Sequence, residues 1–132
     1  MQNIYHTAYF IDNPQDLLSM FKTDLPVIYA HHSTNKYKPD NLDGVEIGKK
    51  VKLKIIGRAK DDKCDVLLVE NDKSENKYPH ITLSCTKVVP PMYSNQLLEM
   101  TDKDGSIEYF SDAKYINVTE GYVIKEERAV VG

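Results

Sequence analysis

The sequence predicts an α+β fold, with a curved, mainly antiparallel sheet and two short helices on its outside. The segment KVKLKIIG (50–57) alternates lysines with aliphatic residues, which is typical of a half-buried antiparallel strand. Two short segments, 14–21 and 94–100, place apolar residues at helical spacing. The length of 132 residues and the hydrophobic content of 41% indicate one globular domain, residues 1–132.

The first part of the chain predicts a strand, a helix and a second strand. Residues 1–12 are rich in Tyr, Ile and Phe, as strands are. Asn13 is a suitable helix N-cap and Pro14 a suitable first helical residue. The helix is expected to end at residues 24–26, and residues 27–34 are expected to form the next strand.

The middle of the chain predicts two strands and two loops. Residues 38–50 contain Pro, Asp, Asn and Gly and are expected to form a loop. After the strand 50–57 and a polar turn, DVLLVE (65–70) is nearly all apolar, so we expect it inside the sheet beside that strand. A second polar loop, 71–77, leads to the stretch 79–85.

Pro90 and Pro91 are expected to end the strand that follows this loop. Ser94 is then expected to cap a short helix that runs to Met100, and residues 102–105 are expected to form a turn. Further strands are expected at 106–110, 115–118 and 122–131, with a tight turn at Glu120–Gly121.

Two stretches, AHHSTNKYKP and PHITLSC, each contain a histidine followed two residues later by a threonine. The pairs are His32 with Thr34 and His80 with Thr82. Residues two apart on a strand share one face, so each pair is expected to present an imidazole and a hydroxyl side by side. In the second stretch, isoleucine and leucine take the alternate positions and are expected to enter the core.

The phase of the first stretch stays open, because His31 and Ser33 have the same spacing as His32 and Thr34. Apolar residues precede both histidines at alternate positions, so alternation does not separate the two. The fourth histidine, His6, has no hydroxyl residue two positions later, and we expect it to be a strand residue without a chemical role.

Paired imidazoles and hydroxyls suit the cleavage of a phosphodiester without a metal ion. A neutral imidazole takes a proton from water while a protonated imidazole gives one to the departing oxygen, and histidine suits both roles because its ordinary pKa is about 6.5. Hydroxyl groups can donate hydrogen bonds to the phosphate oxygens. We therefore expect both histidines in a cleft, on the concave face of the sheet.

The stretches HSTNKY (32–37) and HITLSCTKVVPPMYSNQLLEM (80–100) resemble the two motifs of the two-histidine (LigT-like) phosphoesterases. This family includes RNA cyclic phosphodiesterases and a domain of fungal tRNA ligases. Within it, the chain is most similar to the catalytic domain of the 2′,3′-cyclic-nucleotide phosphodiesterases. AYFIDNP and GYVIKEERAVV are similar, more loosely, to that domain's first and last strands. The resemblance implies a compact bilobal arrangement, in which the two motif strands enclose the cleft.

The resemblance also implies that His32, Thr34, His80 and Thr82 are the catalytic residues, which selects His32 over His31. It implies a metal-independent phosphodiesterase that hydrolyses a 2′,3′-cyclic phosphate or a related RNA or nucleotide phosphodiester. The alternatives are a hydrolase of 2′-5′ oligoadenylate or cyclic oligonucleotide signals, a nucleotide-binding module without turnover, and a structural domain in which both histidines are incidental.

Three further residues are expected to bind the substrate. Lys36 and Tyr37 complete the first motif of the family. Tyr37 and Tyr78 lie near the motifs in sequence, where an aromatic ring can stack on a base.

Composition excludes several other classes of protein. The net charge of −3 argues against a general nucleic-acid coat, although a nucleotide or an RNA end remains a suitable substrate. Cys64 and Cys85 fit no zinc pattern and are expected to be reduced and buried, so we expect no metal and no cofactor. No apolar run is long enough to span a bilayer and no signal peptide is evident, so we expect a cytoplasmic protein without an obligate protein partner.

Overall fold

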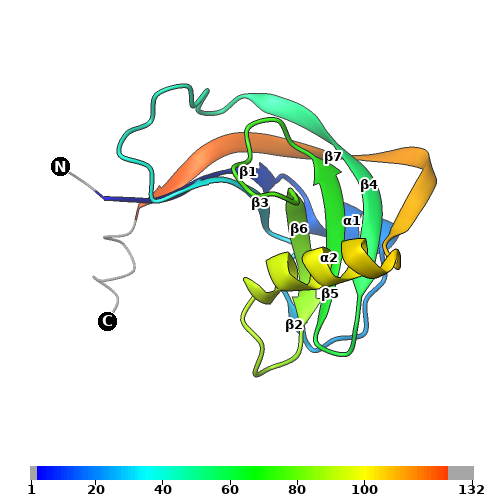
Figure 1. Ribbon diagram of the computed structural model, residues 1–132. Coiled ribbons are helices and arrows are strands. Elements are labelled where there is room, and N and C mark those ends of the chain that lie inside the picture. The colour runs from blue at the N-terminus through cyan, green and yellow to red at the C-terminus, as the bar shows by residue number, and fades with distance from the viewer. Residues whose placement is uncertain (1–2, 125–132) are drawn as a thin grey trace.

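The computed structural model describes residues 3–124, which form a seven-stranded antiparallel sheet and two helices (Figure 1). The strands are β1 (Ile4–Ile11), β2 (Val27–Ile28), β3 (His32–Tyr37), β4 (Lys50–Lys60), β5 (Cys64–Glu70), β6 (His80–Cys85) and β7 (Glu108–Ile124). The helices are α1 (Pro14–Met20) and α2 (Tyr93–Asp104). The predicted α+β class, the antiparallel sheet and the two helices are confirmed.

The sheet curls so far that one short segment, between β2 and β3, forms hydrogen bonds with strands near both of its ends. Its order is β2-β6-β5-β4-β7-β1-β3, so β2 and β3 lie at opposite ends although they are consecutive in sequence. Between them, Ala30 N–H donates to Thr82 O of β6 at 3.0 Å, and His31 O accepts from Ile11 N–H of β1 at 2.9 Å. Ala30 has a φ of +48°, in the left-handed region, and the chain bends here. The bend splits the single strand predicted for 27–34 into two.

One side of the sheet is filled by hydrophobic side chains. The largest cluster draws buried residues from both halves of the sheet: Tyr9, Ile11, Leu17, Phe21, Ala30, Leu53, Ile55, Leu67, Val69, Ile81, Leu83, Ile116 and Val118. Leu17 and Phe21 come from α1 and the residue after it, so α1 covers this side. This side of the sheet therefore holds the main core, and the opposite side is called the outer face.

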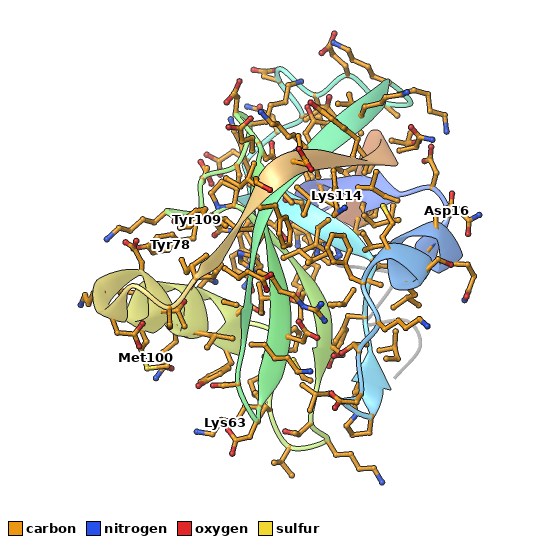
Figure 2. All side chains as sticks on the ribbon, turned by 90° about the vertical axis from the view of Figure 1, so that its right-hand side faces the viewer. Asp16, Lys63, Tyr78, Met100, Tyr109 and Lys114 are labelled. Carbon is orange, nitrogen blue, oxygen red and sulfur yellow. The ribbon has the colours of Figure 1, made fainter. Side chains whose placement is uncertain are left out.

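Strand β5 is buried on both faces, as its apolar sequence predicts. Leu67 and Val69 enter the main core, whereas Val66 and Leu68 pack in a second cluster with Leu97 and other residues of α2. Helix α2 thus covers the outer face of the sheet beside β5, and Figure 2 shows α1 and α2 on opposite sides of the sheet.

Helix α1 begins as the sequence predicts. The side chain of Asn13 accepts a hydrogen bond from the backbone N–H of Gln15 at 3.1 Å, and Pro14 occupies the first turn. Leu17 then points into the main core.

Helix α2 departs from its prediction at both ends. Its N-cap is Met92, without a side-chain hydrogen bond, so the predicted cap at Ser94 is wrong. Ser94 instead lies within the first turn and is fully buried. The helix continues through the predicted turn and ends at Gly105, whose φ of +76° suits glycine.

Strand β7 is one continuous strand where the sequence predicted three. It pairs with β1 and β4 along its length, so the predicted turn at Glu120–Gly121 is wrong. The predicted strand 122–131 extends past Ile124, outside the described residues. Strand β4 is also longer than predicted, because it continues through Arg58 to Lys60.

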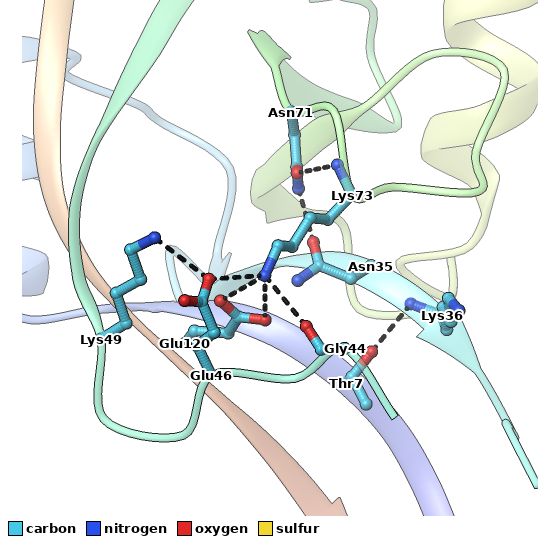
Figure 3. A network of polar contacts seen from close by, with 9 residues as sticks. All are labelled: Thr7, Asn35, Lys36, Gly44, Glu46, Lys49, Asn71, Lys73 and Glu120. Carbon is cyan, nitrogen blue, oxygen red and sulfur yellow. Dashed lines mark hydrogen bonds and ion pairs between the residues drawn. The ribbon is translucent and has the colours of Figure 1, made fainter. Parts of the chain in front are cut away.

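The environment of Glu120 explains in part why β7 continues through the predicted turn. Glu120 is buried and forms an ion pair with Lys73, 47 positions away in sequence. Lys73 Nζ lies 2.9 Å from both carboxylate oxygens of Glu120, 3.2 Å from Glu46 Oε2 and 3.1 Å from the carbonyl of Gly44 (Figure 3). This ion cluster ties the long loop before β4 and the loop before β6 to β7.

The two cysteines are free and buried, directly opposite each other in the β5–β6 ladder. Neither described helix is long and apolar enough to cross a membrane.

Candidate functional site

A pocket of about 500 Å³ opens on the outer face of the sheet, between β1 with β3 on one side and β6 with the start of α2 on the other. Its lining includes all four histidines of the chain, two threonines, three tyrosines and two asparagines. These residues, with Pro91 and Met92, are Tyr5, His6, Tyr29, His31, His32, Thr34, Tyr37, Asn76, His80, Thr82 and Asn95. The structure thus brings both predicted histidine–threonine pairs into one cavity.

The strand alternation of β6 places the second pair as predicted. Ile81 and Leu83 are fully buried in the main core, and His80 and Thr82 point to the other face and line the pocket. Both side chains therefore lie on the face of the sheet opposite the main core. The cleft lies on the outer face, beside α2.

The bend at Ala30 lets both consecutive histidines reach the pocket. The strand proper starts at His32, and Thr34 shares its face. Ser33 points the other way, is fully buried and accepts a hydrogen bond from the side chain of Asn71 at 3.1 Å. The pair in the pocket is therefore His32 with Thr34, while His31 enters as a third imidazole without a hydroxyl partner of its own.

A β-bulge turns Lys36 away from the pocket and Tyr37 toward it. Thr34 pairs with Ala8 of β1, and Lys36 pairs with Thr7, which directly precedes Ala8. Strand β3 therefore has one extra residue between these two pairs. The backbone N–H of Lys36 donates to Thr7 Oγ1 at 3.1 Å (Figure 3). Lys36 is not among the residues that line the pocket, whereas Tyr37 lies at its rim with 57% of its surface exposed.

Tyr78 contacts the site through its backbone carbonyl and not through its ring. Its hydroxyl donates to Asp102 of α2 at 2.7 Å, which raises the pKa of Tyr78 to about 12, and its ring is not part of the lining. The carbonyl of Tyr78 lies 2.7 Å from His80 Nδ1. A carbonyl only accepts, so His80 carries a proton on Nδ1 and its Nε2 remains for a substrate.

The environment holds both motif histidines in the neutral form. Burial, with the neighbouring His6, His31 and His80, lowers the pKa of His32 to about 3. Burial also lowers the pKa of His80, but the hydrogen bond to the carbonyl of Tyr78 acts in the opposite direction.

The hydroxyls of the two threonines have different surroundings. Thr82 Oγ1 lies 2.8 Å from Ser94 Oγ in the first turn of α2. Thr82 Oγ1 also donates to the carbonyl oxygen of Pro91 over a long contact of 3.5 Å, so a bound anion has to compete with this carbonyl for the Thr82 proton. Thr34 lines the pocket, and its Oγ1 makes no hydrogen bond with residues 3–124, so this hydroxyl can donate to a ligand.

Two residues of the site were not predicted from the sequence to belong to it. His6 lies on β1, and its ring stacks on the ring of His32 with centroids 4.7 Å apart and planes 15° apart. Ser94 supports Thr82. Both contacts join segments far apart in sequence, and no spacing rule within either segment signals them.

No protein-family model matches the chain, and no curated protein matches it. Within residues 3–124, no group of three or more His, Cys, Asp or Glu side chains is placed to hold a metal ion. The described lining of the pocket also contains no lysine, arginine or carboxylate, so histidines are the groups that can move a proton there near neutral pH.

Proposed function

We propose that this protein is a metal-independent phosphodiesterase of the two-histidine type, which hydrolyses a 2′,3′-cyclic phosphate or a related phosphodiester of a nucleotide or an RNA end in the cytoplasm. One observation carries the proposal: His32, Thr34, His80 and Thr82 line a single cavity from two strands that are distant in sequence. Strands β1 and β3 on one side and β6 with α2 on the other would correspond to the two lobes of that family.

The two histidines have environments that suit different roles. Burial, with the neighbouring imidazoles, lowers the pKa of His32 to about 3, so His32 is neutral when the reaction begins and acts as the base. His80 has its Nδ1–H fixed on the carbonyl of Tyr78, which favours its charged form, and a bound phosphate anion favours that form further. His80 is therefore the acid.

In the proposed step, water attacks the phosphorus atom and His32 Nε2 takes a proton from it. A phosphorus–oxygen bond to the ribose breaks, and His80 Nε2–H gives its proton to that ribose oxygen. The product is a phosphate monoester with a free hydroxyl, and the proton returns from His32 to His80 through solvent. Thr34 and Thr82 donate hydrogen bonds to the phosphate oxygens that do not react, where negative charge grows.

The rim of the pocket offers room for a base. Tyr37 is exposed, and its ring makes a T-shaped contact with the ring of Tyr5, with centroids 5.5 Å apart, so Tyr5 helps to hold the Tyr37 ring in place. A ring held in this way can stack on a nucleobase. Lys38 Nζ lies 5.3 Å from the centre of the Tyr37 ring and would bring positive charge near a nucleotide.

The proposal is tested by turnover in EDTA across 2′,3′-cyclic nucleotides, 2′-5′ oligoadenylates and cyclic oligonucleotides. We expect hydrolysis of at least one substrate, and a loss of about 10²- to 10⁴-fold in kcat for His32→Ala and for His80→Ala. Lys52→Ala, on β4 and outside this pocket, is the control and should keep full activity. The proposal fails if no substrate turns over, or if both histidine variants keep normal kcat.

One observation favours a second candidate, a nucleotide-binding module without turnover. Burial lowers the pKa of both His32 and His80, which favours the neutral form of both motif histidines at neutral pH when no anion is bound. Calorimetry with the same panel separates the candidates: binding of a cyclic nucleotide that is recovered intact after long incubation supports the binding module.

A further inference from the structure

Two neighbouring imidazoles meet nitrogen to nitrogen at the edge of the pocket. His31 Nδ1 lies 2.9 Å from His32 Nδ1, and the two ring planes are almost perpendicular, at 88°. Two uncharged imidazole nitrogens at this distance share one proton, so one ring donates and the other accepts. The contact therefore determines which nitrogen of His32 carries its proton, and it leaves Nε2 as the nitrogen that can face a substrate.

We propose that His31 is a positioning residue for His32: it accepts a hydrogen bond from His32 Nδ1–H and so keeps a free lone pair on His32 Nε2. The inference rests on the proposed function, in which His32 is the base. In the opposite tautomer, with the proton on Nε2, His32 cannot take a proton from water.

The exposure of the two rings favours this direction of the bond. His31 is exposed to solvent, so its own Nε2–H can bond to water while Nδ1 keeps a lone pair. His32 is half-buried, and its Nδ1–H then has a protein acceptor. With this arrangement each N–H of the pair has a partner, in protein or in water.

The other neighbours of His32 are placed for different contacts. The pocket lining within the described chain contains no carboxylate, the group that commonly orients a histidine base. His6 lies parallel to His32, 15° between planes, and so meets its face and not the N–H at its edge. Nδ1 of His80 is bonded to a backbone carbonyl.

The remaining titratable groups that line the pocket in the described chain are the phenols of Tyr5, Tyr29 and Tyr37. During the proposed reaction, His32 Nε2 gains the proton from water and Nδ1–H stays on His31. The neutral His31 ring then accepts from an imidazolium, a stronger hydrogen bond that stabilises the new charge.

The test uses the full chain with two variants at position 31. His31→Phe keeps a ring and removes both nitrogens. His31→Asn places a carbonyl oxygen the same number of bonds from the backbone as His31 Nδ1, so it can still accept from His32 but cannot be protonated. Because His31 is exposed, both variants are expected to fold, which circular dichroism checks.

The first readout is the tautomer of His32, measured by ¹⁵N NMR of the side chain above pH 7. We expect the proton on Nδ1 in the wild type and in His31→Asn, and a shift toward the Nε2–H tautomer in His31→Phe. A wild-type protein with the proton on Nε2 overturns the inference, as does a His31→Phe variant whose tautomer is unchanged.

The second readout is steady-state kinetics on the substrate that turns over. Loss of an orienting partner typically costs about 10- to 100-fold, so we expect kcat to fall by that factor in His31→Phe, with KM little changed, and to be restored in His31→Asn. A His31→Phe variant with full kcat overturns the inference. If no substrate turns over but the tautomer follows the variants as expected, the positioning contact stands and the proposed function fails.

Discussion

Arg58 of β4 and Asp65 of β5 form the ion pair whose loss we expect to cost the most stability. Asp65 is fully buried, and its two oxygens accept from Arg58 Nε at 2.9 Å and Nη2 at 2.7 Å. Thr23 also donates to Asp65 at 2.9 Å, and Arg58 Nη2 donates to the carbonyl of Lys22 at 2.8 Å. The pair thus ties the β4–β5 hairpin to the chain that leads into β2.

The structure sets the size of the effect of Arg58→Ala. The substitution leaves the Asp65 carboxylate buried without its cation, and breaking a buried pair in this way costs roughly 3 to 5 kcal/mol. The same two strands supply a matched control, Lys54 with Glu70, whose atoms are 3.5 Å apart and whose side chains are 40% and 57% exposed. Lys54→Ala should cost about 0 to 1 kcal/mol.

The assay is urea unfolding of wild type, Arg58→Ala and Lys54→Ala at pH 7, followed by circular dichroism. We expect the free energy of unfolding to fall by several kcal/mol more for Arg58→Ala than for Lys54→Ala. A double variant, Arg58→Met with Asp65→Leu, should recover much of the loss because it leaves neither charge of this pair buried. Equal losses for the two single variants would refute the reasoning, because burial would then not distinguish the pairs.

Two further predictions concern the pocket. Because the pKa of His32 is lowered to about 3 in the fold, the unfolded chain binds its proton first as pH falls below about 6.5, so stability should decrease between pH 6.5 and 3, by on the order of 2 kcal/mol at pH 5. Urea unfolding should show a weaker acid dependence in His32→Gln, and an identical dependence would contradict the buried neutral state. Thr34→Val and Thr82→Val each remove a hydroxyl donor and should lower kcat/KM by about 10²-fold, partly through KM; unchanged kinetics in either variant would remove that hydroxyl from the mechanism.

The sequence by itself determined the features that depend on neighbours along the chain. In β6, Ile81 and Leu83 have to be buried, and with a period of two this places His80 and Thr82 together on the other face. The cap at Asn13 and the doubly buried strand β5 follow in the same way from local hydrogen bonding and from local composition.

Tertiary contacts decided the features that such local rules leave open. Which of His31 and His32 shares a face of the strand with a threonine depended on the bend at Ala30, where the chain leaves β6 and joins β1. Ala30 is in the left-handed region, which breaks the alternation of faces, so alternation before Ala30 could not predict the faces of the residues after it. The inserted residue in β3 turned Lys36 away, because the pairing register with β1 belongs to both strands and not to the motif alone.

The same reason explains the errors at Glu120 and Ser94 and the unexpected place of His6. Glu120 remains inside a long strand because Lys73, 47 positions away, neutralises it, and Ser94 is buried against Thr82 of another strand. His6 reaches His32 only because β1 and β3 pair side by side. The sequence therefore determined which residues share a face on each strand, and the curling of the sheet decided which of them meet, since that curling arises from burial and pairing between distant segments.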